Sequence, residues 1–154
     1  MEEGSRVELT AAADVGVFDS CDGMPPVGAV LFADLSGFRQ LTETRGDEAA
    51  ADAATRFAGL VRRSLAPGAH VVKTLGDGVL VVAPDLDAAR ETATQIRCAV
   101  MVDDGLPPVH AGICAGSVVW RHGDVFGATV NDAARFADSA GPWEIAENCT
   151  WSPR

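Results

Sequence analysis

The stretch that decides the fold reads Val71-Val72-Lys73-Thr74-Leu75-Gly76-Asp77-Gly78-Val79-Leu80-Val81-Val82. Two apolar, β-branched runs flank a Gly-Asp-Gly tip, and this pattern predicts a β-hairpin that carries a carboxylate at its turn. The glycines beside Asp77 allow a sharp bend and leave room for a ligand close to the main chain. Lys73, the only lysine in the protein, stands four residues before that carboxylate. By itself the stretch fits a strand-edge lysine next to a polar turn equally well, so its meaning depends on the rest of the chain.

The composition is that of one folded domain. The chain has 154 residues, of which 47% are hydrophobic and 22% are charged, and these values argue against global disorder. This length supports a single domain with its own core and is short for two. The formal net charge of −10 disfavours general nucleic-acid binding, because nucleic-acid-binding surfaces are basic. An anionic small substrate would need a metal ion or a local cluster of Lys and Arg to offset the repulsion.

Cysteine spacing and the first residues bear on the cellular compartment. The four cysteines lie far apart and form no Cys-x-x-Cys pair, so no zinc site is predicted. Cys98 and Cys114 fall within apolar periodic segments, where a free cysteine is usually a small hydrophobic residue. The start of the chain is acidic and has no apolar run of the kind that signal peptides carry. No apolar stretch reaches membrane-spanning length. The sequence therefore predicts a reduced, cytoplasmic protein that binds no membrane.

The chain changes character at Val27. Residues 1–26 show weak periodicity and end in Gly-Met-Pro-Pro, so they are expected to form a tail or a loosely packed segment. Residues 27–33 are a continuous apolar run typical of a strand buried on both faces, and Asp34 follows at its end. A helix up to about Leu65 is expected next, because its second half repeats apolar residues on one face.

Beyond the hairpin, the pattern predicts two further helices and several extended segments. Pro84-Asp85 opens the clearest amphipathic helix, with Asp85 as its expected N-cap. A strand is expected over 109–113, followed by a short extension over 117–120 and a turn over 122–124. A third helix is expected from about 127, and a final short strand over 143–145. The order β-α-β-β-α-β followed by αβ predicts an α+β fold. It is a ferredoxin-like sheet with helices on one face, plus a C-terminal αβ extension.

Asp34 and Asp77 would lie side by side in such a fold, one at the end of the first strand and one at the hairpin tip. Their oxygens suit Mg²⁺, which keeps several waters and needs only one or two protein carboxylates plus substrate phosphates. A two-metal site of this type can lower the pKa of an attacking hydroxyl and stabilise a leaving pyrophosphate. The simpler alternative is that each aspartate caps a turn.

Asn131 and Arg135 are four residues apart, so they are expected to project from one face of the third helix. An amide and a guanidinium together can orient a ribose and neutralise charge on a phosphoryl group in transfer. The alternative is an ordinary solvated helix face, to which Asp132 and Asp138 would belong. Asp124 lies in a tight turn, where aspartate is common for local reasons.

Three motifs in a specific order and spacing carry a family resemblance. They are Phe32-Ala33-Asp34-Leu35-Ser36-Gly37-Phe38, Val72-Lys73-Thr74-Leu75-Gly76-Asp77-Gly78, and Gly123-Asp124-Val125-Phe126-Gly127 leading into Val130-Asn131-Asp132-Ala133-Ala134-Arg135. Together they resemble the catalytic domain of the class III nucleotidyl cyclases, the adenylate and guanylate cyclases. The resemblance spans residues 27 to about 147. It implies a catalytic domain over 27–154, with 1–26 as a preceding tail.

The resemblance implies a metal site and a base-reading pair. Asp34 and Asp77 match the two metal-binding aspartates, which hold two Mg²⁺ or Mn²⁺ ions, and the Leu35 carbonyl matches a backbone ligand. Lys73 and Asp124 match the pair that reads the purine edge, with aspartate as the adenine-selecting choice. A lysine donor and an aspartate acceptor can pair with N1 and the amino group of adenine, whereas guanine would leave both mismatched.

The resemblance also implies the activity and the assembly. Asn131 matches the ribose-orienting residue and Arg135 the transition-state arginine. In this family the metal ligands lie on one domain, and the base-reading and transition-state residues lie on the other. Because this chain carries both sets, the resemblance implies a homodimer with two sites and an inactive lone protomer. The expected reaction converts ATP into 3′,5′-cyclic AMP and pyrophosphate.

Three alternatives stay open at this point. The same fold could act on GTP or a pyrimidine triphosphate, or it could be a catalytically silent nucleotide-binding or dimerisation module. A diguanylate cyclase is disfavoured, because the hairpin tip is Gly76-Asp77-Gly78 and not a Gly-Gly-Asp/Glu-Glu-Phe motif.

The chain departs from the family pattern in two places. The segment from Gly116 to Asp124 is shorter than the arm of many family members. No lysine follows Lys73 up to the last residue, Arg154, so triphosphate affinity is expected to rest on the metals and backbone amides.

Overall fold

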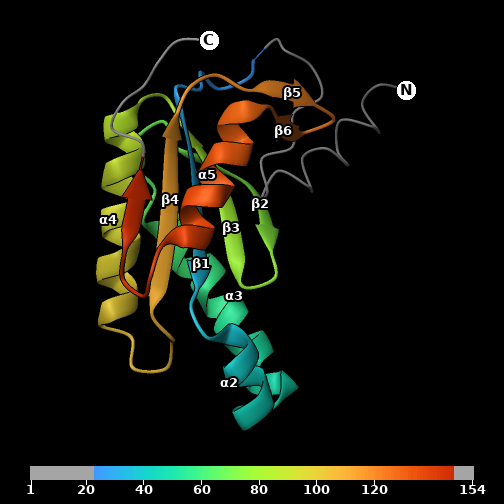
Figure 1. Ribbon diagram of the computed structural model, residues 1–154, viewed down its shortest axis with the longest axis vertical. Helices are drawn as coiled ribbons and strands as arrows, with labels where there is room; N and C mark the ends of the chain where they lie inside the picture. The colour runs from blue at the N-terminus through green and yellow to red at the C-terminus, as the bar shows by residue number, and fades with distance from the viewer. Residues whose placement is uncertain (1–22, 148–154) are drawn as a thin grey trace.

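The computed structural model describes residues 23–147 and is built around one five-stranded sheet (Figure 1). The strands, in spatial order, are β2 (His70–Leu75), β3 (Gly78–Ala83), β1 (Ala29–Leu35), β4 (Val109–Ala115) and β7 (Ile145–Glu147). The first four pair antiparallel, and β7 adds to β4 in parallel. The order β2-β3-β1-β4 is that of a ferredoxin-like βαββαβ unit, which confirms the predicted fold.

The predicted hairpin is present as β2 and β3. Leu75 pairs with Gly78 across the turn, and Gly76 has a φ of 65°. A residue with a Cβ adopts that left-handed conformation at a cost, so the glycine in the Gly-Asp-Gly tip is required for the turn itself. The register shifts between Val71 and Lys73, so β2 carries an irregularity one residue before the lysine.

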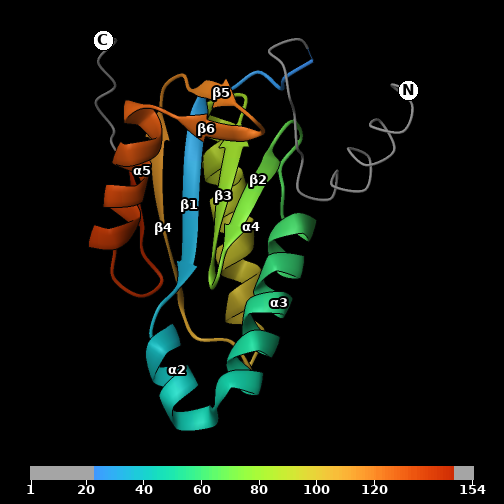
Figure 2. The same ribbon diagram turned by 90° about the vertical axis from the view of Figure 1, so that its right-hand side faces the viewer.

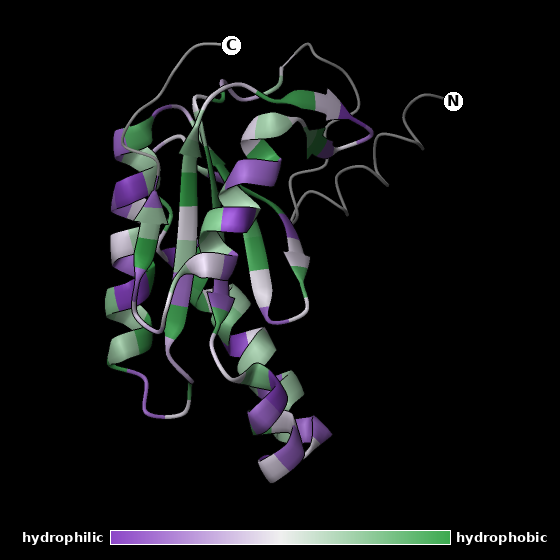
Figure 3. Cartoon of the chain, in the orientation of Figure 1, coloured by the Kyte–Doolittle hydropathy of each residue, from purple (hydrophilic) through white to green (hydrophobic). Residues whose placement is uncertain are grey.

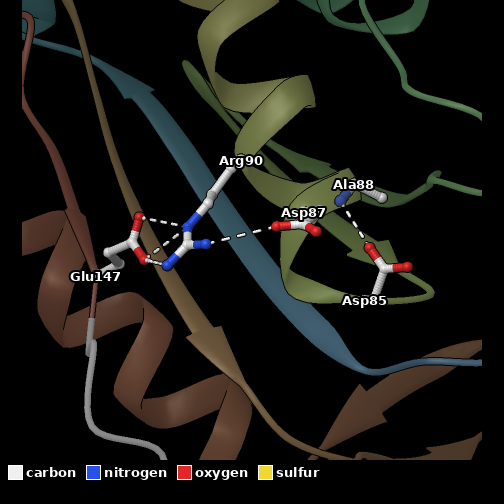
Figure 4. Close-up of polar contacts among 5 residues, drawn as sticks. All are labelled: Asp85, Asp87, Ala88, Arg90 and Glu147. Carbon is white, nitrogen blue, oxygen red and sulfur yellow. Dashed lines mark hydrogen bonds and ion pairs between the residues drawn. The ribbon is translucent and has the colours of Figure 1, made fainter.

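Two long helices cover one face of the sheet. They are α3 (Asp47–Arg63) and α4 (Leu86–Met101). Alternate residues of β1, among them Leu31 and Leu35, are buried against them. Asp85 caps α4 as predicted, because its Oδ1 accepts a hydrogen bond of 2.8 Å from the Ala88 N–H (Figure 4). The predicted amphipathic helix is therefore present, and its buried residues are Ala89, Thr92, Ala93, Ile96 and Val100.

The helix predicted from the end of β1 to about Leu65 is two helices. The first is α2 (Phe38–Arg45), which buries no residue and is mostly hydrophilic (Figure 3). Gly46 separates it from α3, with a φ of 92° that breaks the helical path. The apolar periodicity lay only in the second half of the segment, and that half is α3.

The C-terminal extension covers the other face of the sheet. Helix α5 (Ala128–Ser139) packs over β4 and β1, beside a two-stranded sheet of β5 (Val119–Arg121) and β6 (Asp124–Phe126). Figure 2 shows α5 on one side of the sheet and α3 and α4 on the other. The helices of the βαββαβ unit therefore share one face, and the extension supplies a second layer. This explains why β1 is buried on both faces, as its continuous apolar run predicted.

The edge strand β7 is tied to α4 by an ion pair. The Arg90 guanidinium donates to both carboxylate oxygens of Glu147, with Nε at 2.9 Å and 3.1 Å, and it also contacts Asp87 (Figure 4). Such a two-point contact fixes direction as well as distance.

None of the helices in residues 23–147 is both long enough and apolar enough to cross a membrane. Cys98 is exposed on α4, whereas Cys114 is buried in β4.

Candidate active site

Strand pairing brings Asp34 and Asp77 together. Asp34 is opposite Gly78 in the β1–β3 register, and the Leu35 N–H donates to the Asp77 carbonyl at 3.3 Å. A Cβ on Gly78 would lie 3.1 Å from Asp34 Oδ1, so the glycine leaves the space that this carboxylate occupies. The end of β1 and the hairpin tip lie at the same end of the sheet in both views (Figures 1 and 2). The predicted carboxylate pair therefore forms within one chain.

The environment raises the pKa of Asp34 to about 7. The largest cause is burial, followed by the hydrogen bond and the like charge of Asp77, with a smaller contribution from Asp138. The Leu35 N–H, 3.1 Å from Asp34 Oδ1, acts in the opposite direction. Two carboxylates that share a proton in this way have surplus negative charge when both ionise, and a cation would neutralise it.

The donor set fits a magnesium-type ion. Asp34 and Asp77 supply carboxylate oxygens, and the Leu35 main chain lies next to both. Among the described residues, no three His, Cys, Asp or Glu side chains converge as a metal site. Mg²⁺ and Mn²⁺ suit such a partial shell, because waters and substrate phosphates complete it. Coordination by the Leu35 carbonyl stays a prediction.

Lys73 and Asp124 are far apart in the sequence but form a direct contact in the structure. Lys73 Nζ donates a hydrogen bond of 2.8 Å to Asp124 Oδ2, across 51 positions of sequence. The other oxygen of Asp124 accepts from the Val125 N–H at 2.8 Å. The lysine side chain is 40% exposed and the aspartate side chain 30%. An ammonium donor and a carboxylate acceptor thus stand side by side where a ligand can reach them.

Asn131 and Arg135 lie on the exposed side of α5. Arg135 is 72% exposed, and its guanidinium donates to Asp132 on the same helix. No hydrogen bond or ion pair described for residues 23–147 joins Asn131 or Arg135 to Asp34 or to Asp77. The first turn of α5 also lies at the end of the sheet opposite the hairpin tip (Figures 1 and 2). Within one chain, the contacts described for residues 23–147 therefore do not join these predicted catalytic residues to the carboxylate pair.

His110 is a residue of this site that the sequence reasoning missed. It pairs with Asp34 in the β1–β4 register, and its Nε2 lies 3.8 Å from Asp34 Oδ2. The alternation of side chains along a strand could have indicated it, because His110 is a polar residue on the same face of β4 as Gly112 and Cys114. That signal requires the pairing of β4 with β1, which the one-dimensional pattern does not contain.

Comparisons with known proteins agree with this geometry. The chain is 39% identical over 140 residues to a pH-sensitive adenylate cyclase of Mycobacterium tuberculosis, covering 88% of this chain and 35% of that protein. It is 41% identical over 112 residues to an adenylate cyclase of Streptomyces griseus, covering 72% of this chain and 28% of that protein. The chain thus spans about a third of the length of these relatives. No family model matches it.

A solved structure gives the same result for the fold. The adenylate/guanylate cyclase/hydrolase of Silicibacter pomeroyi superimposes with a TM-score of 0.61 at 29% identity, covering 79% of this chain and 74% of that one. The chain therefore belongs to the class III nucleotidyl cyclases, and its described residues have the fold of their catalytic domain.

Proposed function

We propose that this protein is an adenylate cyclase that converts ATP into 3′,5′-cyclic AMP and pyrophosphate. The observation that carries the proposal is the meeting of Asp34 and Asp77 at the end of β1 and the hairpin tip. In this reaction the ribose 3′ oxygen forms a bond to the α-phosphorus, and the bond from that phosphorus to the leaving oxygen breaks. The hydroxyl proton is released to solvent, and pyrophosphate leaves with the bonding electrons.

Asp34 and Asp77 would hold two Mg²⁺ or Mn²⁺ ions per site, with the Leu35 carbonyl as a further ligand. When bound, the ions lower the pKa of the attacking hydroxyl and offset charge on the phosphates. The two carboxylates would hold the ions to which the triphosphate end of the substrate binds. No side chain among the described residues is assigned as a dedicated general base.

Lys73 and Asp124 would select the base. They are within 2.8 Å of each other, so a flat base edge with adjacent acceptor and donor atoms can bind both at once. Adenine presents this arrangement at N1 and its amino group. Guanine presents the reverse, and an unmatched polar group in a binding site costs about 1–3 kcal/mol. The names of the two relatives, both adenylate cyclases, favour the same choice.

Asn131 and Arg135 would act across a dimer interface. On one chain they are exposed on α5 and are not joined to the carboxylates. A symmetric pair of chains can place α5 of one protomer opposite Asp34 and Asp77 of its partner, which gives two equivalent sites. Asn131 would then orient the ribose, and Arg135 would neutralise charge that develops on the phosphates.

The test is product identification. Purified protein is incubated with each of the four nucleoside triphosphates and Mn²⁺, and the cyclic products are identified by mass. We expect cyclic AMP from ATP in clear excess, and no product from Asp34→Ala. Cyclic GMP or a cyclic pyrimidine nucleotide in excess would contradict the base assignment. No cyclic product from any triphosphate would favour a silent nucleotide-binding module.

A further inference from the structure

His110 lies between the carboxylate Asp34 and the helix α5, and it belongs to none of the three sequence motifs. Its side chain is 14% exposed. One ring nitrogen, Nδ1, is 2.7 Å from the Ala137 carbonyl oxygen of α5, and the other, Nε2, is 3.8 Å from Asp34 Oδ2. A carbonyl oxygen only accepts hydrogen bonds, so Nδ1 carries the proton and donates. The Nε2 edge of the ring is therefore the edge that faces the carboxylate.

The ring is held firmly on its α5 side. The Ala137 carbonyl is in the last turn of α5, and it accepts from the Ala140 N–H at 3.2 Å as well as from His110 Nδ1 at 2.7 Å. Helix α5 packs directly on the backbone of β4, because a Cβ on Gly112 would lie only 2.1 Å from the Ala137 nitrogen. Backbone thus meets backbone beside His110, and the Nδ1 bond sets the angle of the ring.

On its Asp34 side the ring is close to the carboxylate but makes no direct hydrogen bond with it. His110 and Asp34 are direct cross-strand partners, and cross-strand side chains on one face lie close together. The separation of 3.8 Å is longer than a direct hydrogen bond. The imidazole therefore limits the orientations open to the carboxylate by contact and by its polar edge.

We propose that His110 is a positioning residue that holds the Asp34 carboxylate toward Asp77, with α5 as its anchor. The proposal rests on the proposed function, because Asp34 is a metal ligand there. Groups just outside a metal shell orient the ligands, and losing one typically costs about 10–100-fold in metal affinity or activity. The same ring also ties the metal-binding end of the sheet to the helix that carries Asn131 and Arg135.

Two substitutions separate the two edges of the ring. The amide of asparagine reaches as far as Nδ1, so His110→Asn keeps a donor for Ala137 and removes the edge that faces Asp34. The amide of glutamine reaches as far as Nε2, so His110→Gln keeps a polar group beside Asp34 and gives up the donor to α5. His70→Asn, the same change on β2, is the matched control.

The experiment measures thermal unfolding of the full chain during a Mn²⁺ titration with 3′-deoxy-ATP, which lacks the attacking hydroxyl. The half-saturating Mn²⁺ concentration should rise about ten-fold or more in His110→Asn and change by less than about three-fold in His110→Gln and His70→Asn. Without metal, His110→Gln should melt at a lower temperature than His110→Asn, because it leaves the Ala137 carbonyl without this donor. The Mn²⁺ concentration that gives half-maximal activity should shift in parallel.

Two outcomes would overturn the inference while leaving the proposed function intact. One is an unchanged Mn²⁺ midpoint in His110→Asn with an active wild-type protein. The other is an equal loss of Mn²⁺ affinity in both variants that follows their melting temperatures, because the ring would then serve only the fold. A wild-type protein that shows no Mn²⁺-dependent stabilisation and no cyclic product would instead overturn the proposed function, and the inference with it.

Discussion

Lys73 and Asp124 are joined by a hydrogen bond of 2.8 Å between the ammonium and a carboxylate oxygen, although 51 positions separate them in the sequence. The only lysine of the chain comes from β2, and the aspartate comes from the small β5–β6 sheet. Each group is partly exposed, so the pair is accessible and weakly stabilising: exposed ion pairs contribute about 0–1 kcal/mol. The pair therefore adds little to the stability of the fold, and its proposed role in base recognition is what substitution of Lys73 would test.

The first prediction concerns base selection. Lys73→Ala removes the donor to adenine, so kcat/KM for ATP should fall about 10–100-fold, as expected for a hydrogen bond to a charged group. The ratio of ATP to GTP turnover should fall as well, while the half-saturating Mn²⁺ concentration stays within about three-fold. Steady-state rates with both nucleotides measure this. Arg62→Ala on α3 removes a positive charge outside the site and is the control; an unchanged ATP to GTP ratio in Lys73→Ala would contradict the assignment.

The second prediction concerns pH and the metal-free protein. The folded-state pKa of Asp34 is raised from 3.8 to about 7 by burial and by Asp77, so the folded chain binds this proton more tightly than the unfolded chain does. The stability that the protonated group supports is fully present below about pH 4 and is lost as pH rises to about 7. In EDTA, Asp34→Asn should therefore melt at a higher temperature than wild type at pH 7.5, with a smaller difference at pH 5.

Added metal should reverse that order. Mn²⁺ should raise the melting temperature of wild type at pH 7.5 and leave Asp34→Asn nearly unchanged, because metal binding requires the ionised carboxylate. Asp52→Asn, on the exposed side of α3, controls for a charge change elsewhere. A lower melting temperature for Asp34→Asn than for wild type in EDTA at pH 7.5 would show that the ionised Asp34 carboxylate does not destabilise the metal-free fold.

The third prediction concerns the shared site. A 1:1 mixture of Asp34→Ala and Arg135→Ala chains should regain about a quarter of wild-type activity, because half of the randomly assorted dimers are mixed and each has one intact site. Co-expression followed by activity measurement tests this. Each variant alone should remain inactive. Mixed dimers that form but show no activity would mean that both residues act within one chain.

The fourth prediction concerns the packing of α5 on β4. A Cβ at Gly112 would lie 2.1 Å from the Ala137 nitrogen and 2.4 Å from the Ala133 oxygen. Gly112→Ala should therefore lower the free energy of unfolding by about 1–3 kcal/mol or more, since overpacking against backbone cannot be relieved by a rotamer change. Chemical denaturation measures it. Gly59→Ala, inside α3 and open to solvent at its Cβ apart from Arg63 at 3.4 Å, should instead raise stability by about 0.5–1 kcal/mol.

Local signals in the sequence determined most of the elements. The apolar runs gave β1 and β3, because strands buried on both faces consist mostly of apolar residues, and Val71-Val72 gave the buried part of β2. The Gly-Asp-Gly tip placed Asp77 at a turn, and Asp85 marked the start of α4. The break at Gly46 was missed, since a lone glycine in a helical pattern is often tolerated. These features depend on neighbours within a few residues, which the sequence displays directly.

Only the tertiary structure decided how these elements combine. The sheet order set Asp34 beside Asp77 and His110, the extension placed α5 on the face opposite α3 and α4, and the β5–β6 sheet carried Asp124 to Lys73. The raised pKa of Asp34 also belongs to this level, because it arises from burial and from a second carboxylate far away in the chain. Strand register and layer packing join residues that are distant in sequence, and burial changes how charges interact, so neither can be read from the order of residues alone.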